Sequence, residues 1–248
     1  MSENKVNNKK IYDSTWVDWV DMKIYGPASR WLRSLIKDQL AFIGPNKIKS
    51  VLDVGSGEGT ITYHLAKDIP EAQVTGIDFS LTGILCAKKA YSSPNLKFIH
   101  DEGSVNLKNK YDLVTAFEVL EHIEDWKNLL GRMADASNKY VLVSFPTGRM
   151  RAFEVIVGHF RNFKKGEVEE FMKQKGFKAE SIFYAGFPFY NPIYREVCNL
   201  TNSAGNSFTT GKYGWKQKSL SAVIFFFFKY CSTKRKLGDQ FCGLFEKI

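Results

Sequence analysis

The stretch from Ser50 to Thr60 constrains the fold of this 248-residue chain more than any other. It begins with a short apolar run that is typical of a buried strand, and three glycines follow at alternate positions, Gly55, Gly57 and Gly59. Apolar residues at helical spacing come next, from 61 to 66. A strand, a glycine turn and a helix open the nucleotide-binding α/β folds, in which the helix N-terminus points free N–H groups at the ligand. The stretch therefore predicts an α/β fold with a ligand at this turn.

The spacing of the glycines separates the ligand classes. A dinucleotide fingerprint requires G-x-G-x-x-G and a P-loop requires G-x-x-x-x-G-K-[ST], and neither pattern is present. The pattern Asp53-x-Gly55-x-Gly57-x-Gly59 resembles the first motif of class I S-adenosylmethionine (SAM) methyltransferases. The resemblance implies that Asp53, Gly55, Ser56 and Gly57 bind the amino-acid end of SAM, with Asp53 meeting the ammonium through water or backbone.

Composition fits one globular domain, because 44% of the residues are hydrophobic and 25% are charged. The formal net charge of +9 is uneven: residues 51–145 carry four more acids than bases, and residues 146–248 carry nine more bases than acids. A basic C-terminal third suits either a solvated surface or a face for an anionic substrate, a nucleic acid or a phospholipid headgroup.

Targeting signals and cysteines predict a cytoplasmic protein. The N-terminus is rich in Lys and Asn and lacks the apolar segment of a secretory signal, and the apolar run 220–228 is too short to span a membrane. Four cysteines without C-x-x-C or metal-ligand spacing indicate reduced thiols. Peripheral contact with a membrane and the oligomeric state are left open.

Residues 1–49 are predicted to form an N-terminal helical cap. Apolar residues recur at helical spacing from about 13 to 24 and again from 28 to 42, with Gly-Pro breaks after each. Helices ahead of the first strand resemble the cap that closes over the cofactor in small-molecule methyltransferases. We interpret the aromatic residues of this region as packing residues, with Tyr25 as a candidate substrate contact.

Acids follow the second and third predicted strands. The second strand, 73–79, ends in Asp78 and Phe79, and an acid about 20 residues past the glycine loop can accept hydrogen bonds from both ribose hydroxyls. We therefore predict that Asp78 and Phe79 contact the cofactor. Asp101 and Glu102 follow the third strand, where the resemblance implies an acid that binds the adenine amino group. Either acid could serve, and a plain turn acid is the alternative.

The segment Phe117–Ile123, "FEVLEHI", follows the fourth predicted strand and resembles the ubiquinone-pathway O-methyltransferases. The resemblance implies that Phe117 flanks SAM and that the segment supplies acceptor-site residues. Glu118 and His122 are four apart and share a face if the loop turns helically. A histidine near a carboxylate is a candidate general base, although His122 could equally serve only to order the loop.

Basic residues gather after the fifth predicted strand, where "GHFRNF" resembles the acceptor-pocket segment of the same group and implies that His159 borders the pocket. His159 is the second candidate base. The cationic cluster suits a phosphate or carboxylate and comprises His159, Arg149, Arg151 and Arg161. We predict no metal site, although the ubiquinone-type relatives leave room for a divalent ion beside Glu118 and Glu121.

The predicted architecture is a single Rossmann-like α/β domain over residues 50–248. It has a seven-stranded, mostly parallel sheet with helices on both faces and an antiparallel last strand. An insertion at about 188–239 separates the sixth and seventh strands. Phe225 to Phe228 cover every side of a helix predicted at 216–231, which favours packing inside the domain over contact with a bilayer.

The predicted function is SAM-dependent methylation of oxygen or nitrogen on a small or amphiphilic, anionic acceptor, such as a lipid-linked or sugar-linked compound. A non-catalytic SAM-binding or scaffold protein is one alternative, and a nucleic-acid methyltransferase is another. The nucleic-acid methyltransferase is disfavoured because amino-methylating DNA enzymes carry an Asn/Asp-Pro-Pro-aromatic motif after the fourth strand. Here that place reads "FEVL", residues 117–120.

Overall fold

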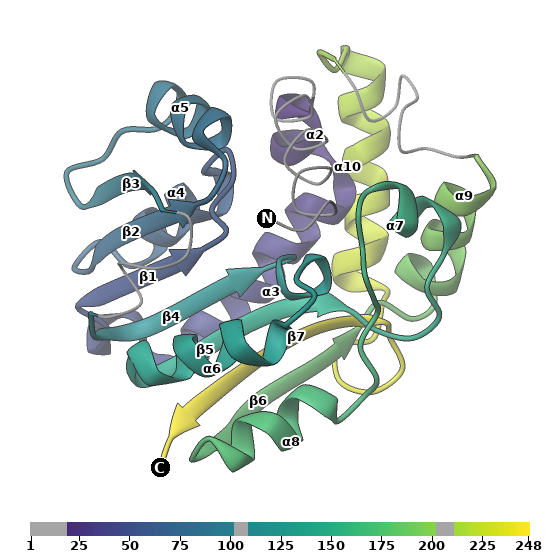
Figure 1. Ribbon diagram of the computed structural model, residues 1–248. Helices are drawn as coiled ribbons and strands as arrows, with labels where there is room; N and C mark the ends of the chain where they lie inside the picture. The colour runs from purple at the N-terminus through teal and green to yellow at the C-terminus, as the bar shows by residue number, and fades with distance from the viewer. Residues whose placement is uncertain (1–18, 102–108, 202–210) are drawn as a thin grey trace.

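A seven-stranded sheet forms the centre of the computed structural model, which describes residues 19–101, 109–201 and 211–248 (Figure 1). The strand order is β3-β2-β1-β4-β5-β7-β6. All neighbours pair in parallel except β7, which is antiparallel to both β5 and β6. The strands are β1 Ser50–Val54, β2 Gln73–Asp78, β3 Leu96–His100, β4 Tyr111–Phe117, β5 Ser137–Pro146, β6 Phe177–Ala185 and β7 Gln240–Lys247. The predicted sheet is confirmed.

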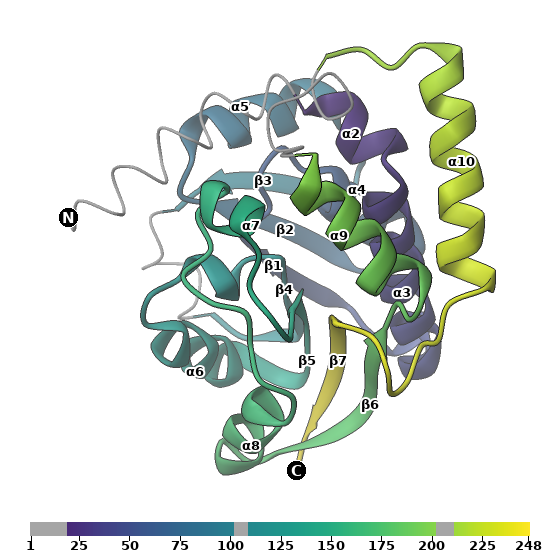
Figure 2. The ribbon, with the colours of Figure 1, turned by 90° about the vertical axis from the view of Figure 1, so that its right-hand side faces the viewer.

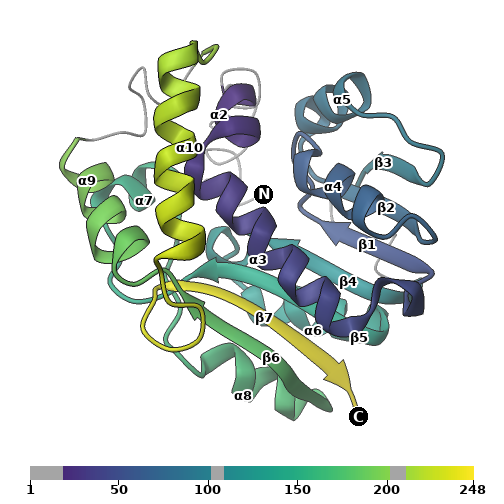
Figure 3. The ribbon, with the colours of Figure 1, turned by 180° about the vertical axis from the view of Figure 1, so that it is seen from behind.

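Helices cover both faces of the sheet, as predicted. On one face lie α3 (Pro27–Ile43) and α4 (Thr60–Asp68), and α5 (Leu81–Ala90) packs on β2 and β3. The other face carries α6 (Trp126–Ala136) and α8 (Glu167–Gln174) (Figures 1 and 3). Each face has its own apolar cluster, because strands buried on both sides carry apolar residues at successive positions.

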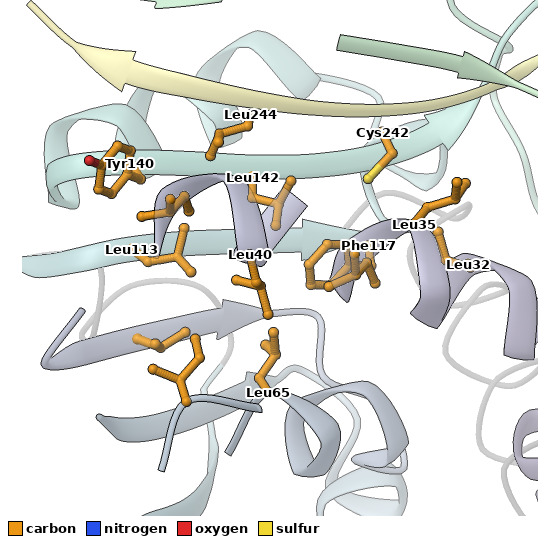
Figure 4. Close-up of a cluster of buried hydrophobic side chains, with 14 of the residues drawn as sticks. Leu32, Leu35, Leu40, Leu65, Leu113, Phe117, Tyr140, Leu142, Cys242 and Leu244 are labelled. Atoms are coloured by element: carbon orange, nitrogen blue, oxygen red, sulfur yellow. The ribbon is translucent and has the colours of Figure 1, made fainter. Parts of the chain in front are cut away.

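The helix α3 belongs to the sheet core. Trp31, Leu35 and Leu40 are at most 1% exposed, and the two leucines lie with Leu142 and Cys242 in one cluster (Figure 4). A shorter helix, α2 (Val20–Tyr25), precedes it, and the predicted start of this helix near residue 13 lies outside the described residues. The division into a cap and a domain stays a prediction.

The insertion between β6 and β7 contains an irregular helical turn (Phe189–Tyr194), α9 (Arg195–Leu200) and α10 (Trp215–Tyr230). A short helix after β5, α7 (Ala152–Ile156), lies near α9. The long helix α10 lies alongside α2 and α3, on their outer side (Figures 2 and 3). No helix in the described ranges combines the length and apolarity needed to span a bilayer.

The predicted burial of the Phe225–Phe228 run is wrong for half of the run. Phe228 is 2% exposed, but Phe226 is 52% and Phe227 38% exposed. One side of α10 packs on α3, and the opposite side, which is also apolar, faces solvent.

Candidate active site

A cavity of about 730 Å³ follows the carboxyl edge of the sheet from β2 to β7. Asp78 of β2, Asp53 of β1, Phe117 of β4 and Gln240 of β7 all line it. Residues of α2, α3 and the insertion close its outer side. This edge is where ligands bind in open α/β sheets, and the volume lies within the usual range of about 300–1,000 Å³ for ligand pockets.

The glycine turn is held in a shape that other residues rarely adopt. Gly55 has a φ of 76°, and a Cβ there would come within 2.4 Å of the Val119 side chain. The N–H groups of Gly55 and Ser56 both donate to the carbonyl of Ile77, at 2.8 and 2.9 Å. The turn is thereby fastened to the end of β2, where it forms one wall of the cavity.

Asp78 completes this attachment. Its Oδ2 accepts from the N–H of Gly57 at 2.8 Å, and its Oδ1 accepts from the N–H of Ser80 at 2.7 Å. The carboxylate is nearly buried, and burial raises its pKa to about 6 although the two N–H groups oppose this. Each oxygen keeps a second lone pair, so Asp78 can also accept hydrogen bonds from a ligand in the cavity.

Asp53 lies below the turn and bonds to protein hydroxyls. Thr62 Oγ1 donates to Oδ2 at 2.6 Å, and Thr115 Oγ1 donates to Oδ1 at 2.7 Å. Burial raises the pKa of Asp53 to about 6. The residue therefore joins β1 to α4 and β4. Sequence analysis missed the two threonines because isolated threonines carry no motif, although a buried strand aspartate requires such donors.

The remaining predicted cofactor residues of the described chain, Phe79, Asp101 and Phe117, line the cavity. Glu102 lies outside the described residues. Two buried polar atoms of the glycine turn, Ser56 Oγ and Glu58 Oε1, have no hydrogen-bond partner among the described residues. Because buried polar atoms normally have partners, these two atoms suit a polar ligand in the cavity.

Glu118 has an unusual backbone conformation for a residue with a side chain, with a φ of 56°. This conformation brings its Oε1 to hydroxyl and amide donors, Ser144 Oγ and Gln240 Nε2, each at 2.8 Å. Burial raises the pKa of the carboxyl. Glu118 and His122 both line the cavity. The chain is not helical at Glu118, so they do not share the helical face that their spacing predicted.

His122 is oriented by the chain that follows β5. Its Nδ1 lies 3.1 Å from the carbonyl oxygen of Gly158. Because a carbonyl only accepts, we assign the proton of the neutral ring to Nδ1, which makes Nε2 a hydrogen-bond acceptor. Burial lowers the pKa of His122 to about 3, and the neighbouring His159 contributes to this. The two rings meet edge to face with centroids 4.5 Å apart.

His122 belongs to a set of three side chains that could bind a metal ion. Ligand atoms of Glu121, His122 and His159 all lie within 4.8 Å of one another. Both carboxylate oxygens of Glu121 are buried and lack a hydrogen-bond partner within the described ranges. Such a set could hold a divalent ion that accepts nitrogen ligands. The sequence predicted no metal site but left room for an ion beside Glu118 and Glu121; the contribution of His159 could not be seen because it is far from the other two residues in the chain.

The predicted basic acceptor residues do not line the cavity. Arg149 and Arg151 each form an ion pair with Glu196 at 2.7 Å, and Arg161 donates to the carbonyl of Glu124. His159 lies behind His122 and also stays outside the lining. The predicted cationic cluster therefore lies outside the cavity lining, and two of its members, Arg149 and Arg151, are paired with Glu196, which is far along the chain.

Tyr25 is also absent from the cavity wall. The Lys218 ammonium group lies 4.1 Å from the centre of the Tyr25 ring, which places the ring against α10. The packing interpretation fits the position of Tyr25, and its contact with a substrate stays a prediction.

The insertion supplies cavity residues that sequence analysis did not assign to the site. Tyr190, Tyr194 and Arg195 line the wall opposite the glycine turn, together with Trp31 of α3. Arg195 is 2% exposed and forms ion pairs with Glu154 and with Asp239. The aromatic start of the insertion was the available signal, but only the fold decides which side it faces.

Comparison with known proteins identifies the family. A family model described as a methyltransferase domain matches residues 28–182. The chain is 30% identical over 142 residues to the mitochondrial ubiquinone biosynthesis O-methyltransferase of Schizosaccharomyces pombe, which covers 52% of this chain and 49% of that protein. It is 33% identical over 98 residues to trans-aconitate 2-methyltransferase of Deinococcus radiodurans, covering 39% and 37%. The chain thus spans about half or less of the length of these relatives.

Solved structures agree on the fold. The magnesium protoporphyrin IX methyltransferase of Synechocystis PCC 6803, solved with bound SAM, matches with a TM-score of 0.59 and 16% identity. The match covers 100% of this chain and 99% of that one. The family match extends over more than half of the chain and includes the glycine turn, Asp78 and the His122 loop. This chain therefore belongs to the methyltransferase domain family and has the class I SAM-dependent methyltransferase fold.

Proposed function

We propose that this chain transfers the methyl group of SAM to a hydroxyl of a small, amphiphilic acceptor with an apolar or aromatic body. One observation carries the proposal: a single cavity joins Asp78 and the glycine turn to His122 and to the aromatic wall, which is formed by Trp31, Tyr190 and Tyr194. A donor and an acceptor can therefore meet in one enclosure. The similarity to a ubiquinone biosynthesis O-methyltransferase supports oxygen as the methylated atom.

The cofactor half of the cavity suits SAM. Asp78 would accept hydrogen bonds from the ribose hydroxyls, and Asp101 would bind the adenine amino group. The unpartnered Ser56 Oγ and Glu58 Oε1 would bond to the amino-acid end. When bound, SAM supplies an electrophilic methyl group, and its transfer to oxygen breaks the sulfur–methyl bond and leaves S-adenosylhomocysteine.

The acceptor half holds the hydroxyl and removes its proton. Nε2 of His122 is the unprotonated nitrogen that can take this proton as the new oxygen–carbon bond forms, although the lowered pKa makes the ring a weaker base than free imidazole. Aromatic side chains of Trp31, Tyr190 and Tyr194 would hold the body of the acceptor in place. The main contribution of the chain is then to hold the acceptor oxygen in line with the methyl carbon.

The cavity lining does not favour the anionic acceptor predicted from the sequence. Acidic side chains outnumber basic ones in it. Arg195, one of the basic residues of the lining, is already paired with Glu154 and Asp239. We therefore propose a neutral acceptor group. A divalent ion, if held by Glu121, His122 and His159, would occupy Nε2 of His122. It would then lower the pKa of a hydroxyl bound to it, in place of proton removal by the ring.

Methyl-labelled SAM with purified protein and fractionated cell extract tests this proposal. We expect label in small molecules that partition into organic solvent. Label in nucleic acid or protein would contradict the acceptor class. Binding of SAM without turnover on any fraction would instead support the scaffold alternative.

The affinity for SAM is expected to depend on pH through Asp78. Its pKa is about 6 in the free protein. Ribose hydroxyls donate to the ionised form, so binding lowers this pKa and releases a proton. Affinity should be constant above about pH 7 and should fall by up to about tenfold per unit below about pH 6. Calorimetry across this range measures the effect. An Asp78→Asn variant should lose this dependence, and an unchanged wild-type affinity at low pH would contradict the ribose contact.

A further inference from the structure

The outer face of α10 is apolar and exposed. We define this face by Leu220, Val223, Phe226 and Tyr230, which are 48%, 55%, 52% and 65% exposed. Their spacing of three or four residues places them on one side of the helix. Trp215, at the start of α10, is 75% exposed. Large apolar side chains gathered in this way mark an interaction site more often than scattered ones do.

The opposite side of α10 already provides the packing that the helix needs. Phe228 is 2% exposed and lies against Trp31, Tyr190 and Tyr194, with ring centroids 5.1 to 5.6 Å apart. Those three residues line the cavity, so α10 contacts the cavity wall with one side and carries the outer face on the other. Figure 3 shows α10 alongside α3. The apolar residues of the outer face contribute nothing to this packing.

The chain interval that carries the outer face is basic, although Lys234 at its end pairs with Asp38 of α3 at 2.6 Å. No acidic residue occurs between Glu196 and Asp239. That interval contains seven basic residues, Lys212, Lys216, Lys218, Lys229, Lys234, Arg235 and Lys236. They flank both ends of α10, and Arg235 and Lys236 are exposed. Basic side chains at both ends of the apolar outer face complement a surface that has anionic groups outside and an apolar interior, as a lipid bilayer has.

We propose that the outer face of α10 docks on an anionic lipid bilayer. The helix would lie in the plane of the interface with Val223 and Phe226 among the acyl chains. Lysine ammonium groups would reach the lipid phosphates, and Trp215 and Tyr230 would lie at the headgroup level. This proposal does not depend on the methyl-transfer reaction.

Other occupants fit this face less well. A second copy of the chain would bring two sets of seven like charges together at one interface, which is unfavourable. A nucleic acid would place its phosphates against Leu220 and Val223, which offer no hydrogen-bond donor.

Flotation with large vesicles tests the proposal. We expect the protein to float at low salt with vesicles of phosphatidylcholine and phosphatidylglycerol, and to remain unbound with phosphatidylcholine alone. High salt should weaken binding, because it screens the lysine and arginine contribution. A protein that stays in the soluble fraction with the anionic vesicles at low salt would overturn the proposal.

Matched variants locate the contact. Val223→Ser combined with Phe226→Ser should lower the vesicle partition coefficient by about tenfold or more, since it removes the inserted apolar area. Arg235→Gln combined with Lys236→Gln should lower it by up to about 25-fold, because each basic residue near an anionic surface contributes about fivefold. The control is Leu81→Ser combined with Leu85→Ser on α5, at side chains that are 49% and 58% exposed. The control should float like the wild type.

Thermal melting of each variant confirms that it is folded. Outer-face variants that float like the wild type would overturn the proposal. So would variants whose main effect is to dissociate a dimer, measured by light scattering, or to abolish retention on a nucleic acid.

Discussion

Alanine in place of His122 is expected to slow methyl transfer by about a hundredfold or more while SAM affinity stays unchanged, because general-base catalysis contributes about 10²–10⁴. The ring lines the cavity, and its Nδ1 is held by the Gly158 carbonyl, so Nε2 is the proton-accepting atom. The hydrogen bonds that hold the glycine turn and Asp78 in place do not involve this ring.

Single-turnover rates and SAM calorimetry measure the two quantities separately. His64→Ala on α4 is the matched control, because His64 is exposed and does not line the cavity. Added imidazole should restore part of the rate of His122→Ala, which a purely structural role would not predict. Wild-type turnover in the folded variant would mean that positioning alone accounts for catalysis.

Asp78→Ala should weaken SAM binding by about 1.5–3 kcal/mol, which is roughly 10- to 150-fold. The substitution removes the acceptor for the ribose hydroxyls. It also removes the carboxylate that receives the N–H groups of Gly57 and Ser80, so the glycine turn loses its attachment to β2. Both losses act in the same direction.

Calorimetry on the folded variant measures this loss. The control is Asp68→Ala, which removes a surface acid paired with Lys37 and should leave affinity unchanged. If Asp78→Ala binds SAM as the wild type does, the ribose assignment is wrong.

The cofactor half of the cavity could be predicted because its parts are local in the chain. Gly55, Asp78 and Asp101 each follow a strand, and parallel strands in the order found bring those ends to one edge. Strands and turns are determined largely by residues that are neighbours in the chain, so the sequence patterns were enough to predict this arrangement. The threonines that bond to Asp53 come from a helix and from another strand, so no local pattern indicates them.

The acceptor half depended on contacts between distant segments. Arg149 and Arg151 form a local basic cluster in the sequence, but Glu196 pairs with both of them in the folded chain. Tyr190 and Gln240 enter the cavity only because the insertion folds back across the edge of the sheet. The role of a charged or aromatic side chain depends on the side chains that surround it in the folded protein. Spacing and composition do not indicate which residues from distant parts of the chain these are.

The sequence by itself determined that α10 is a helix with apolar residues on every side. Only the tertiary structure decided which side is covered, because α3 and the aromatic wall meet Phe228 and leave Phe226 in solvent. Helical periodicity reports how many sides of a helix are apolar. It does not report how many neighbours the fold supplies, and burial is set by those neighbours.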